Sequence, residues 1–411
     1  MRVVVTGMGA VAPNGNSVSE YWDALIAGQS GIDHITYFDT TDFPVKIAGE
    51  VSNFDPEQYF ERKEVRKLDP FSVYALVASN EAIYMSGLDA GGFDPQRAGV
   101  MLGCGIGGIT TILAEHVVLQ NRGARRISPF FVTKLIANIA GGQIAIKWDL
   151  RGPNQTITSA CASATDAIGL ALRLIQSGSA DIMVAGGTEA SICDLPLAGF
   201  STIRALCNAA DPPQSASRPF DKDRRGFVMG EGSGILVLET EEHAQSRGAT
   251  ILGELAGYGS TNDAFHVTQP AEGGAGAVKA MQLALEDAGA EPEEVDYINA
   301  HGTSTPYNDK NETAAIKTVF GDHARKLKIS STKSMTGHLL GASGGIEAIA
   351  ALKAIEKQTI PPTINYTTPD PDCDLDYVPN TAEETQVNSV LSNTFGFGGH
   401  NAVVFMRKWQ D

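Results

Sequence analysis

The sequence predicts a compact α/β protein with a largely buried sheet. Short β-branched runs alternate with segments of helical periodicity, as where Val3–Thr6 is followed by Tyr21–Ala27. Hydrophobic residues make up 43% of the 411 residues, and 44 glycines supply tight turns. Charged residues make up only 19%, so a disordered or fibrous chain is excluded.

The remaining elements follow in order along the chain. Apolar residues recur at helical spacing over Val73–Met85 and Ala164–Ile175, and Gly87 and Gly178 are suited to end these helices. Three further buried strands are expected, at Val100–Gly103, Ile182–Ala185 and Gly234–Leu238.

A weak internal repeat divides the chain. In the first half Thr158–Cys161 leads into a helix, and Gly226–Leu238 closes with a glycine turn and a strand. In the second half Ser330–Lys333 leads towards the helix Gly345–Ile355, and Ser392–Phe405 closes in the same way. The repeat predicts two similar halves, residues 1–250 and 251–411.

The net charge limits the partners of the protein. With 48 acidic and 31 basic residues the net charge is -17, which repels nucleic acid and anionic membranes, so we expect neither as a partner. No apolar segment reaches the ~18 to 20 residues of a membrane span, which predicts no membrane insertion. The opening Met1–Gly7 has the pattern of a strand rather than of a signal peptide, which predicts a cytoplasmic protein.

Five cysteines are an odd number without a CxxC pair, so neither a disulfide framework nor a zinc site is indicated. Two glycine motifs, Gly7–Ala12 and Gly103–Gly108, match the pattern of dinucleotide-binding loops. Pro13 breaks the helix that the first would need, and in neither case does an acidic residue stand at a clear strand end about 20 positions later. Both are interpreted as tight strand-to-helix turns.

The segment Arg204–Arg225 is rich in Pro, Ser, Asp and Arg. It predicts a long surface excursion within the first half, and loops of that length are often functional.

Cys161 is the strongest single candidate for chemistry. It follows an apolar strand and begins a helix, where free amides and the helix dipole favour a thiolate nucleophile. From local sequence alone, a small buried cysteine is an equally good interpretation.

His301, Lys333 and His338 lie in glycine-rich segments just after the predicted strands Val295–Ile298 and Leu327–Ser331. Each histidine alone suits a structural role. Together with Cys161 they are expected to converge, because side chains at several strand ends can meet at one point of an α/β sheet.

Four motifs carry a resemblance to a known family: TSACASA at Thr158–Ala164, NAHGTST at Asn299–Thr305, KSMTGH at Lys333–His338 and NTFGFGG at Asn393–Gly399. Over essentially its whole length the sequence resembles the β-ketoacyl-acyl-carrier-protein synthases of type II fatty acid synthesis. It is most similar to the elongating synthase II branch, although the synthase I branch shares these motifs.

The resemblance implies a thiolase-like fold of two pseudo-equivalent halves in αβαβα layers, as a homodimer. It implies a decarboxylative Claisen condensation between an acyl chain and malonyl-acyl-carrier protein. Both substrates are carried on the phosphopantetheine of acyl-carrier protein, and no cofactor is required.

The resemblance also implies roles for individual residues. Cys161 accepts the acyl chain as a thioester, and the amides of Cys161 and Phe397 form an oxyanion hole. His301 and His338 act as neutral hydrogen-bond donors to the malonyl thioester oxygen, and Lys333 supports the electrostatics of the site.

The same resemblance gives a substrate-binding set: Thr303, Thr305, Ile106, Phe131, Phe200, Phe395, Gly398 and Gly399. The two threonines hold the phosphopantetheine arm, Phe397 is a gate between flexible glycines, and Ile106, Phe131 and Phe200 form acyl-pocket walls. His400 stands where a threonine is more familiar in the family.

Two further sites are implied. A structural monovalent or divalent cation is held by Asn299, Glu347, Ser392 and Asn393, whose oxygens suit a hard ion. A basic patch for acidic acyl-carrier protein comprises Arg62, Lys63, Arg66, Lys67, Arg125, Arg126 and Arg204. The alternative for this patch is a solvated helix face, with Glu61 and Glu64 interleaved.

Other functions on the same fold stay open. A thiolase needs a second cysteine near the C-terminus, where Phe395–Asn401 has none, and a chain-length factor would replace Cys161. An iterative type II polyketide ketosynthase shares every residue named above. Chain-length and unsaturation preference are not predicted.

Overall fold

The computed structural model describes residues 1–208 and 210–410, in which ten strands form one sheet. The first half contributes, from its outer edge, β5 (Asn154–Ile157), β4 (Ala98–Gly103), β6 (Ile182–Glu189), β7 (Gly232–Thr240) and β1 (Val3–Val11). The second half contributes, from the opposite edge, β10 (Lys328–Ser330), β9 (Tyr297–Asn299), β13 (Ser389–Gly396), β14 (His400–Arg407) and β8 (Gly253–Asn262).

The two sets of strands have the same topology. In each half the outer pairs are parallel and the inner pairs are antiparallel. The halves join where β1 and β8 pair at Val4 and Glu254. Two pseudo-equivalent halves are therefore confirmed, and the equivalence supports the proposed division of the chain near residue 250.

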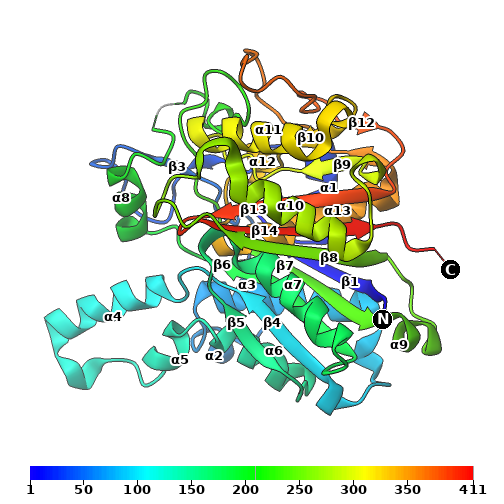
Figure 1. Cartoon of the computed structure of the whole chain (residues 1–411). Helices are drawn as coiled ribbons and strands as arrows, with labels where there is room; N and C mark the ends of the chain where they lie inside the picture. Colours follow the sequence, from blue (N-terminus) through cyan, green and yellow to red (C-terminus); the bar gives the residue numbers. More distant parts are fainter. Residues whose placement is uncertain (209, 411) are drawn as a thin grey trace.

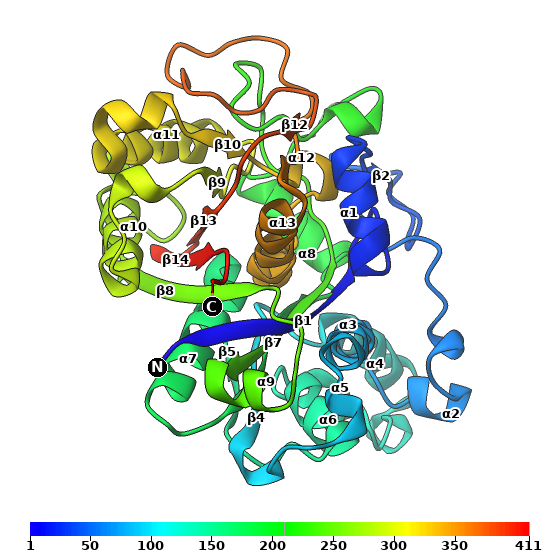
Figure 2. The same ribbon diagram turned by 90° about the vertical axis from the view of Figure 1, so that its right-hand side faces the viewer.

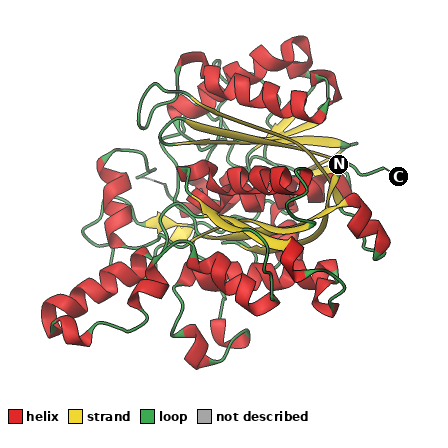
Figure 3. Cartoon of the chain, turned by 60° about the horizontal axis from the view of Figure 1, so that its bottom comes forward, coloured by secondary structure: helices red, strands yellow, loops and turns green. Residues whose placement is uncertain are grey.

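Five layers are visible in Figure 3, with helices outside both layers of strands and between them. The middle layer consists of α7 (Ser163–Gln176) and α13 (Ser343–Lys357), which contact each other and strands of both halves (Figures 1 and 2). The outer layers are α3 (Pro70–Ser86) and α6 (Ile139–Trp148) on the first half, and α10 (Ala275–Ala288) and α11 (Pro306–Phe320) on the second. The predicted αβαβα architecture is confirmed.

The remaining helices are α1 (Val18–Ile26), α2 (Arg62–Val65), α4 (Ile109–Arg122), α5 (Phe131–Leu135), α8 (Asp194–Thr202), α9 (Glu241–Ser246) and α12 (Lys333–Thr336). Two short sheets pair β2 (Asp33–His34) with β3 (Ile47–Ala48), and β11 (Thr359–Ile360) with β12 (Glu383–Glu384). Figure 1 shows α4 and α5 as an arm that extends from the body. Within the described ranges, no helix is long and apolar enough to cross a membrane.

Helix α3 illustrates how the sequence sets its own boundaries. Asp69 accepts a hydrogen bond from the amide of Phe71, Pro70 occupies the first turn, and Gly87 ends the helix with φ 75°. The helix predicted over Val73–Met85 is thus confirmed and begins three residues earlier.

The interpretation of Gly7–Ala12 as a strand-to-helix turn is wrong, because Gly7 and Gly9 lie inside β1. A Cβ atom at Gly9 would stand 1.8 Å from the carbonyl oxygen of Ala78 in α3. The glycines therefore let α3 pack closely on the strand. The second motif does form a turn, which leads from β4 into α4 after Gly108.

The segment Arg204–Arg225 is only partly the surface excursion that its composition predicts. Arg204 is exposed, whereas Phe220 and Asp221 are fully buried. Phe220 stacks on Tyr377 with ring centroids 4.0 Å apart, and Asp221 accepts hydrogen bonds from the amides of Thr367 and Thr368. The end of the segment therefore braces the second half of the molecule.

Candidate active site

The turn that carries Cys161 lies between β5 and α7. Ala160 takes the left-handed conformation with φ 52°, and its carbonyl accepts a hydrogen bond from Ser163 Oγ at 2.6 Å. Ser163 Oγ in turn accepts the Ser159 amide at 3.0 Å. Gly396 packs on the turn, since a Cβ there would stand 3.1 Å from the Cys161 nitrogen. The nucleophile is thus fixed by the backbone on both sides.

The resting state of Cys161 differs from the prediction of a thiolate. Burial raises the pKa of its thiol to about 11, although Lys333 and the amides of Phe397 and Cys161 act to lower it. Desolvation of the anion outweighs the favourable electrostatics of the turn, so the free cysteine holds its proton at neutral pH. The two amides that act on the sulfur are the ones predicted to form the oxyanion hole.

His338 is the closest partner of the nucleophile. Its Nε2 lies 3.0 Å from Cys161 Sγ, and its Nδ1 faces the amide of Leu340 at 3.3 Å and Ser343 Oγ at 2.8 Å. Burial and the charge of Lys333 hold the pKa of the His338 imidazole well below its usual range. Since the Leu340 amide can only donate, the neutral ring carries its proton on Nε2, which points at the sulfur.

His301 completes the pair. Its ring centroid lies 5.4 Å from that of His338 at an interplanar angle of 85°. Burial, with the charges of Lys333 and His338, holds the pKa of the His301 imidazole well below its usual range. Its Nδ1 atom has no partner in the described part of the chain. Two neutral imidazoles therefore converge beside Cys161.

Lys333 begins α12 and is 2% exposed. Its ammonium forms a close ion pair with the buried carboxylate of Glu347. The charge of Lys333 acts on both histidines and on the cysteine, as the pKa shifts above record. The charge of Lys333 therefore lies close to all three groups, and its electrostatic role in the reaction stays a prediction.

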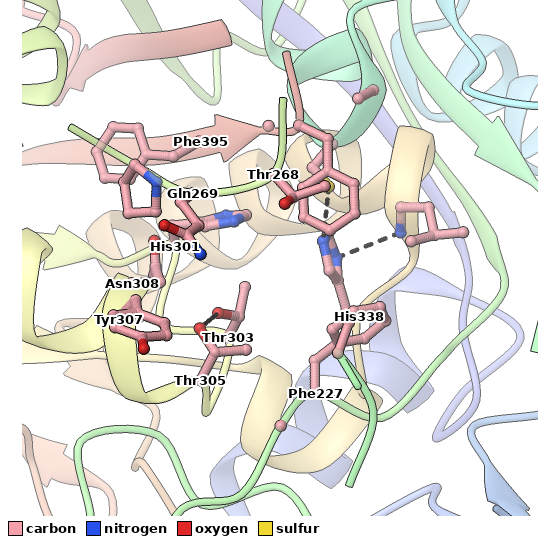
Figure 4. A pocket seen from close by; sticks show the side chains of 18 of the residues that line it. Phe227, Thr268, Gln269, His301, Thr303, Thr305, Tyr307, Asn308, His338 and Phe395 are labelled. Carbon is pink, nitrogen blue, oxygen red and sulfur yellow. Dashed lines mark hydrogen bonds between the residues drawn. The ribbon is translucent and has the colours of Figure 1, made fainter. Parts of the chain in front are cut away.

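These groups open onto a cavity of about 420 Å³ lined by Cys161, His301, His338, Thr303 and Thr305. Figure 4 shows the two threonines below His301 and to the left of His338, and their Oγ1 atoms lie 2.9 Å apart. The hydroxyls are polar contacts in an otherwise largely apolar channel.

The predicted gate borders the same cavity. Phe395 and Phe397 line it, and the ring of Phe397 lies 6.4 Å from that of Phe200. Gly398 and Gly399 have φ of 85° and 77°, which residues with side chains rarely adopt. The ring of His400 lies against Gly398, 3.1 Å from where a Cβ would stand.

Two of the three predicted acyl-pocket residues lie in the cavity wall and one does not. Ile106 and Phe200 line the cavity. Phe131 lies on α5 in the extended arm, outside the cavity of its own chain.

The predicted basic patch is exposed. Arg62 and Lys63 of α2 are paired with Glu57 and Glu61, at 3.4 and 2.7 Å. Lys67 lies over the ring of Phe130 at 5.7 Å, which places the end of α2 beside the arm segment that carries Arg125 and Arg126. Arg66 is exposed, and Arg204 lies on the rim of the cavity.

Three of the four predicted cation ligands are brought together. Asn299 and Ser392 are paired neighbours in β9 and β13. Tyr297 lies on the same strand face as Asn299. Burial and the charge of Glu347 raise the pKa of Tyr297, so the Glu347 carboxylate faces this side of the strand. The side chain of Asn393 points to the other face, where its Nδ2 lies 3.3 Å from Glu312 Oε1.

Buried oxygens of Asn299, Glu347 and Ser392 have no hydrogen-bond partner among the described residues. Unpaired buried oxygens are costly, and an amide, a carboxylate and a hydroxyl oxygen suit a hard cation. These three residues fit the expected ion. No group of three His, Cys, Asp or Glu side chains with metal-site spacing occurs in the described part of the chain.

Sequence reasoning missed two buried carboxylates at the cavity. Glu312 in α11 accepts the amides of His301 and Gly302, both at 2.8 Å, and burial raises its pKa to about 7. Glu189 ends β6 beneath Ile106. Glu189 follows Gly186 and Gly187 at a strand end, a glycine-rich context of the kind that drew attention to His301 and His338, whereas Glu312 lies within a helix and has no such signal.

Comparison with known proteins agrees with this geometry. Residues 1–244 match the model of the beta-ketoacyl synthase N-terminal domain, and residues 252–367 match that of the C-terminal domain. A 3-oxoacyl-[acyl-carrier-protein] synthase 2 of Staphylococcus aureus is 51% identical over 410 residues, covering 100% of this chain and 99% of the relative. The protein of the same name from a Synechocystis species is 51% identical over 409 residues, covering 100% and 98%.

Solved structures agree as well. A beta-ketoacyl synthase of Burkholderia phymatum superimposes with a TM-score of 0.92 at 36% identity, covering all of both chains. A type II polyketide ketosynthase solved with its acyl-carrier protein and a hexaketide has a TM-score of 0.92 at 38% identity, covering 100% of this chain and 99% of its own.

Proposed function

The chain belongs to the beta-ketoacyl synthase family, and on that premise we propose that it condenses an acyl chain held on Cys161 with malonyl-acyl-carrier protein. The products are 3-oxoacyl-acyl-carrier protein and carbon dioxide. The enzyme is a 3-oxoacyl-[acyl-carrier-protein] synthase of the synthase 2 type, which acts in type II fatty acid elongation. The observation that carries this function is the contact of Cys161 with neutral His338, with His301 at the same cavity.

The first step is acyl transfer. Cys161 Sγ attacks the thioester carbonyl of the acyl donor, and the oxyanion that forms is held by the amides of Cys161 and Phe397. The bond to the pantetheine sulfur breaks, and the proton of the cysteine ends on that departing sulfur. Because the thiol of Cys161 has a raised pKa, proton loss and attack take place together rather than from a standing thiolate.

The second step is decarboxylation of the malonyl group. Its carboxylate leaves as carbon dioxide, and the electrons of the broken carbon–carbon bond pass to the thioester oxygen as an enolate. His338 holds a proton on Nε2 towards this space, and His301 faces it from the other side. Neutral donors suit this step because they stabilise the developing charge by hydrogen bonding and are too weakly acidic to protonate the enolate.

The third step joins the chains. The enolate carbon attacks the acyl carbonyl on Cys161, the carbon–sulfur bond breaks, and the cysteine leaves as an anion that takes up one proton. The cysteine thus returns to the protonated thiol of the free enzyme. The Lys333 ammonium favours both anions of the cycle.

The phosphopantetheine arm is proposed to lie between Thr303 and Thr305. Acyl-carrier protein is proposed to dock on Arg62, Lys63, Arg66, Lys67, Arg125, Arg126 and Arg204. Support comes from the exposure of these residues, from the position of Arg204 in the cavity lining and from the contact of Lys67 with the arm. Among the described residues, Arg66 and Lys67 form no ion pair of the kind that Arg62 and Lys63 form, so they offer the stronger attraction.

A homodimer is proposed on the apolar surface of the arm. Val117, Phe130, Val132 and Ile136 expose 57%, 40%, 59% and 38% of their surface there. Phe131 lies on this arm and outside the cavity of its own chain, so its predicted place in an acyl-pocket wall requires a second copy. The cytoplasmic location stays a prediction.

A structural cation is proposed at Asn299, Glu347 and Ser392, where it would satisfy the unpaired oxygens and stabilise the junction of β9, β13 and α13.

The function is tested by mixing the enzyme with acyl- and malonyl-acyl-carrier protein and following 3-oxoacyl product and carbon dioxide together. Equal amounts of both are expected. Carbon dioxide without 3-oxoacyl product, even at saturating acyl donor, would contradict a condensing role.

A further inference from the structure

Glu189 is a fully buried carboxylate without a cationic partner in the described part of the chain, and it lies beside the catalytic cavity. It ends β6, the strand next to β4, whose following turn carries Ile106. It accepts hydrogen bonds from Ser191 Oγ, from Cys104 Sγ and from backbone amides of two separate turns, and both turns supply residues to the cavity wall.

The first turn is the one that positions Ile106. Glu189 Oε2 accepts the amide of Gly105 at 2.8 Å, and Oε1 accepts the amide of Ile106 at 3.2 Å. One carboxylate therefore binds the backbone amide of Ile106 and the amide of the residue before it. The backbone under this part of the wall is fixed, so an acyl chain can displace only the side chain.

The second turn precedes α13. Glu189 Oε2 also accepts the amide of Gly341 at 3.2 Å, next to Leu340, which lines the same cavity. Gly341 stands two residues before α13, as Cys161 stands two residues before α7, and the preceding Leu340 and Ala160 have φ of 49° and 52°. The second half thus contains a turn like the one that carries Cys161. In this turn the amide of Gly341, at the position equivalent to Cys161, donates its hydrogen bond to Glu189.

The glycines of both turns are fitted to the carboxylate. A Cβ at Gly105 would stand 2.6 Å from Glu189 Oε2, and a Cβ at Gly341 would stand 2.7 Å from the same atom. A Cβ at Gly341 would also lie 2.4 Å from the Gly105 nitrogen. The close approach of the two turns and the carboxylate therefore requires glycine at both positions.

We propose that Glu189 is a positioning residue for acyl-chain selection, which clamps the Ile106 turn to the Leu340 turn and so fixes how far the cavity wall can yield. The inference rests on the proposed function, since it concerns the same acyl pocket. A carboxylate suits the task because both oxygens only accept, whereas an amide would turn an NH₂ group towards at least one of the three backbone donors.

The test is a double-mutant cycle between Glu189 and Ile106. Replacing Ile106 by Phe is expected to slow acylation of Cys161 by long-chain acyl-acyl-carrier protein relative to a short-chain donor. In the E189Q background the unclamped turn can move aside, so this length-dependent block is expected to shrink by at least about fivefold. Acylation is followed by intact-protein mass, and each variant is first checked for cooperative thermal unfolding.

Ser191→Ala is the matched control, because Ser191 Oγ donates to Glu189 Oε1 at 3.2 Å while the three amide contacts remain. In that background the Phe block should persist in full. Glu189→Asp keeps the charge, but its side chain is too short to reach both turns, so it should relieve the block as E189Q does. It replaces E189Q in the test if E189Q does not fold.

The outcomes separate the two claims. An equal block in the wild-type, E189Q and E189D backgrounds overturns the clamp, as does failure of both variants to fold, which would make Glu189 purely structural. Wild-type enzyme that takes up no acyl group on Cys161 would instead overturn the proposed function.

Discussion

The Nε2 atom of His338 lies 3.0 Å from the Sγ atom of Cys161, although 177 positions separate the two residues. Cys161 lies in the turn before α7 and His338 in the turn between α12 and α13, in opposite halves, and the packing of α7 against α13 brings the two turns together. Catalysis by this site therefore depends on the interface between two similar halves, each of which supplies part of the chemistry.

Replacing either histidine should separate the two half-reactions. In H301A or H338A the enolate loses one hydrogen-bond donor, so malonyl decarboxylation should fall by roughly 10²- to 10³-fold. Acylation of Cys161 should continue in H301A, because His338, and not His301, forms the described hydrogen bond with the sulfur. Release of labelled carbon dioxide and the mass of the acyl-enzyme measure the two steps. Unchanged malonyl turnover would show that the histidines are structural.

Reversing the charge of Arg66 and Lys67 together should weaken the encounter with acidic acyl-carrier protein. The loss should lie mainly in the association rate and shrink as salt screens charges beyond the ~10 Å Debye length at 0.1 M. Stopped-flow binding at several salt concentrations measures this. Reversal of Arg62 and Lys63, whose charges are already paired, should have a smaller effect. A defect that salt does not change would place the docking site elsewhere.

Replacing Ile106 by Phe should fill the inner cavity. Overpacking typically costs ~1 to 3 kcal/mol, so acylation by long donors should slow by roughly 5- to 150-fold. Short chains should end before the new ring and be much less affected. Parallel acylation with short and long donors is the measurement. Equal losses for both would mean that Ile106 supports the fold and does not bound the acyl pocket.

A buried carboxyl away from the catalytic centre should make stability depend on pH. Burial raises the pKa of Glu231 to about 7, although Tyr37, Val51 and Tyr74 donate hydrogen bonds to it. Because the native state binds this proton more tightly than the unfolded chain does, stability should fall as pH rises from about 5 to 8, by at most about 3 kcal/mol.

Denaturant unfolding of wild type and E231Q at pH 5 and pH 8 checks this. The glutamine variant has no proton to lose, so its stability should fall less over the same range. Other buried carboxyls such as Glu312 contribute equally to both proteins and cancel in the comparison. An identical fall in the two proteins would show that Glu231 is not the titrating group.

The predictable part of the site lies in short turns built from small residues. Cys161 stands in a turn of Ala and Ser residues, and His301 and His338 stand beside glycines, so local composition and family motifs locate them together. Glu312 lies within a helix, and Glu189 follows Gly186 and Gly187 at a strand end, but their hydrogen bonds to backbone amides arise only from tertiary packing. The raised pKa of Cys161 could not be predicted either. A helix start, and hence its dipole, can be predicted from the sequence, whereas the extent of burial that desolvates the thiol cannot.

The fold shows the same division. Periodicity predicts α3 and α7 with small errors at their ends, because their caps and apolar spacing are local. The role of Gly7 in β1 depends on α3 lying across the strand, some 70 residues away in sequence. Burial of Phe220 depends on Tyr377 in the other half. The features that could not be predicted from the sequence therefore depend on contacts between segments that are distant along the chain.

The mass of the acyl-enzyme tests the central claim most directly. Wild-type protein and the C161A variant are each incubated with acyl-acyl-carrier protein, digested, and analysed for the acylated peptide, with malonyl decarboxylation followed in parallel. We predict that the acyl group lies on Cys161 in wild type, that C161A takes up none and forms no 3-oxoacyl product, and that C161A still releases carbon dioxide from malonyl-acyl-carrier protein. An acyl group on Cys193 or Cys207 instead, or condensation that persists in C161A, would contradict the account.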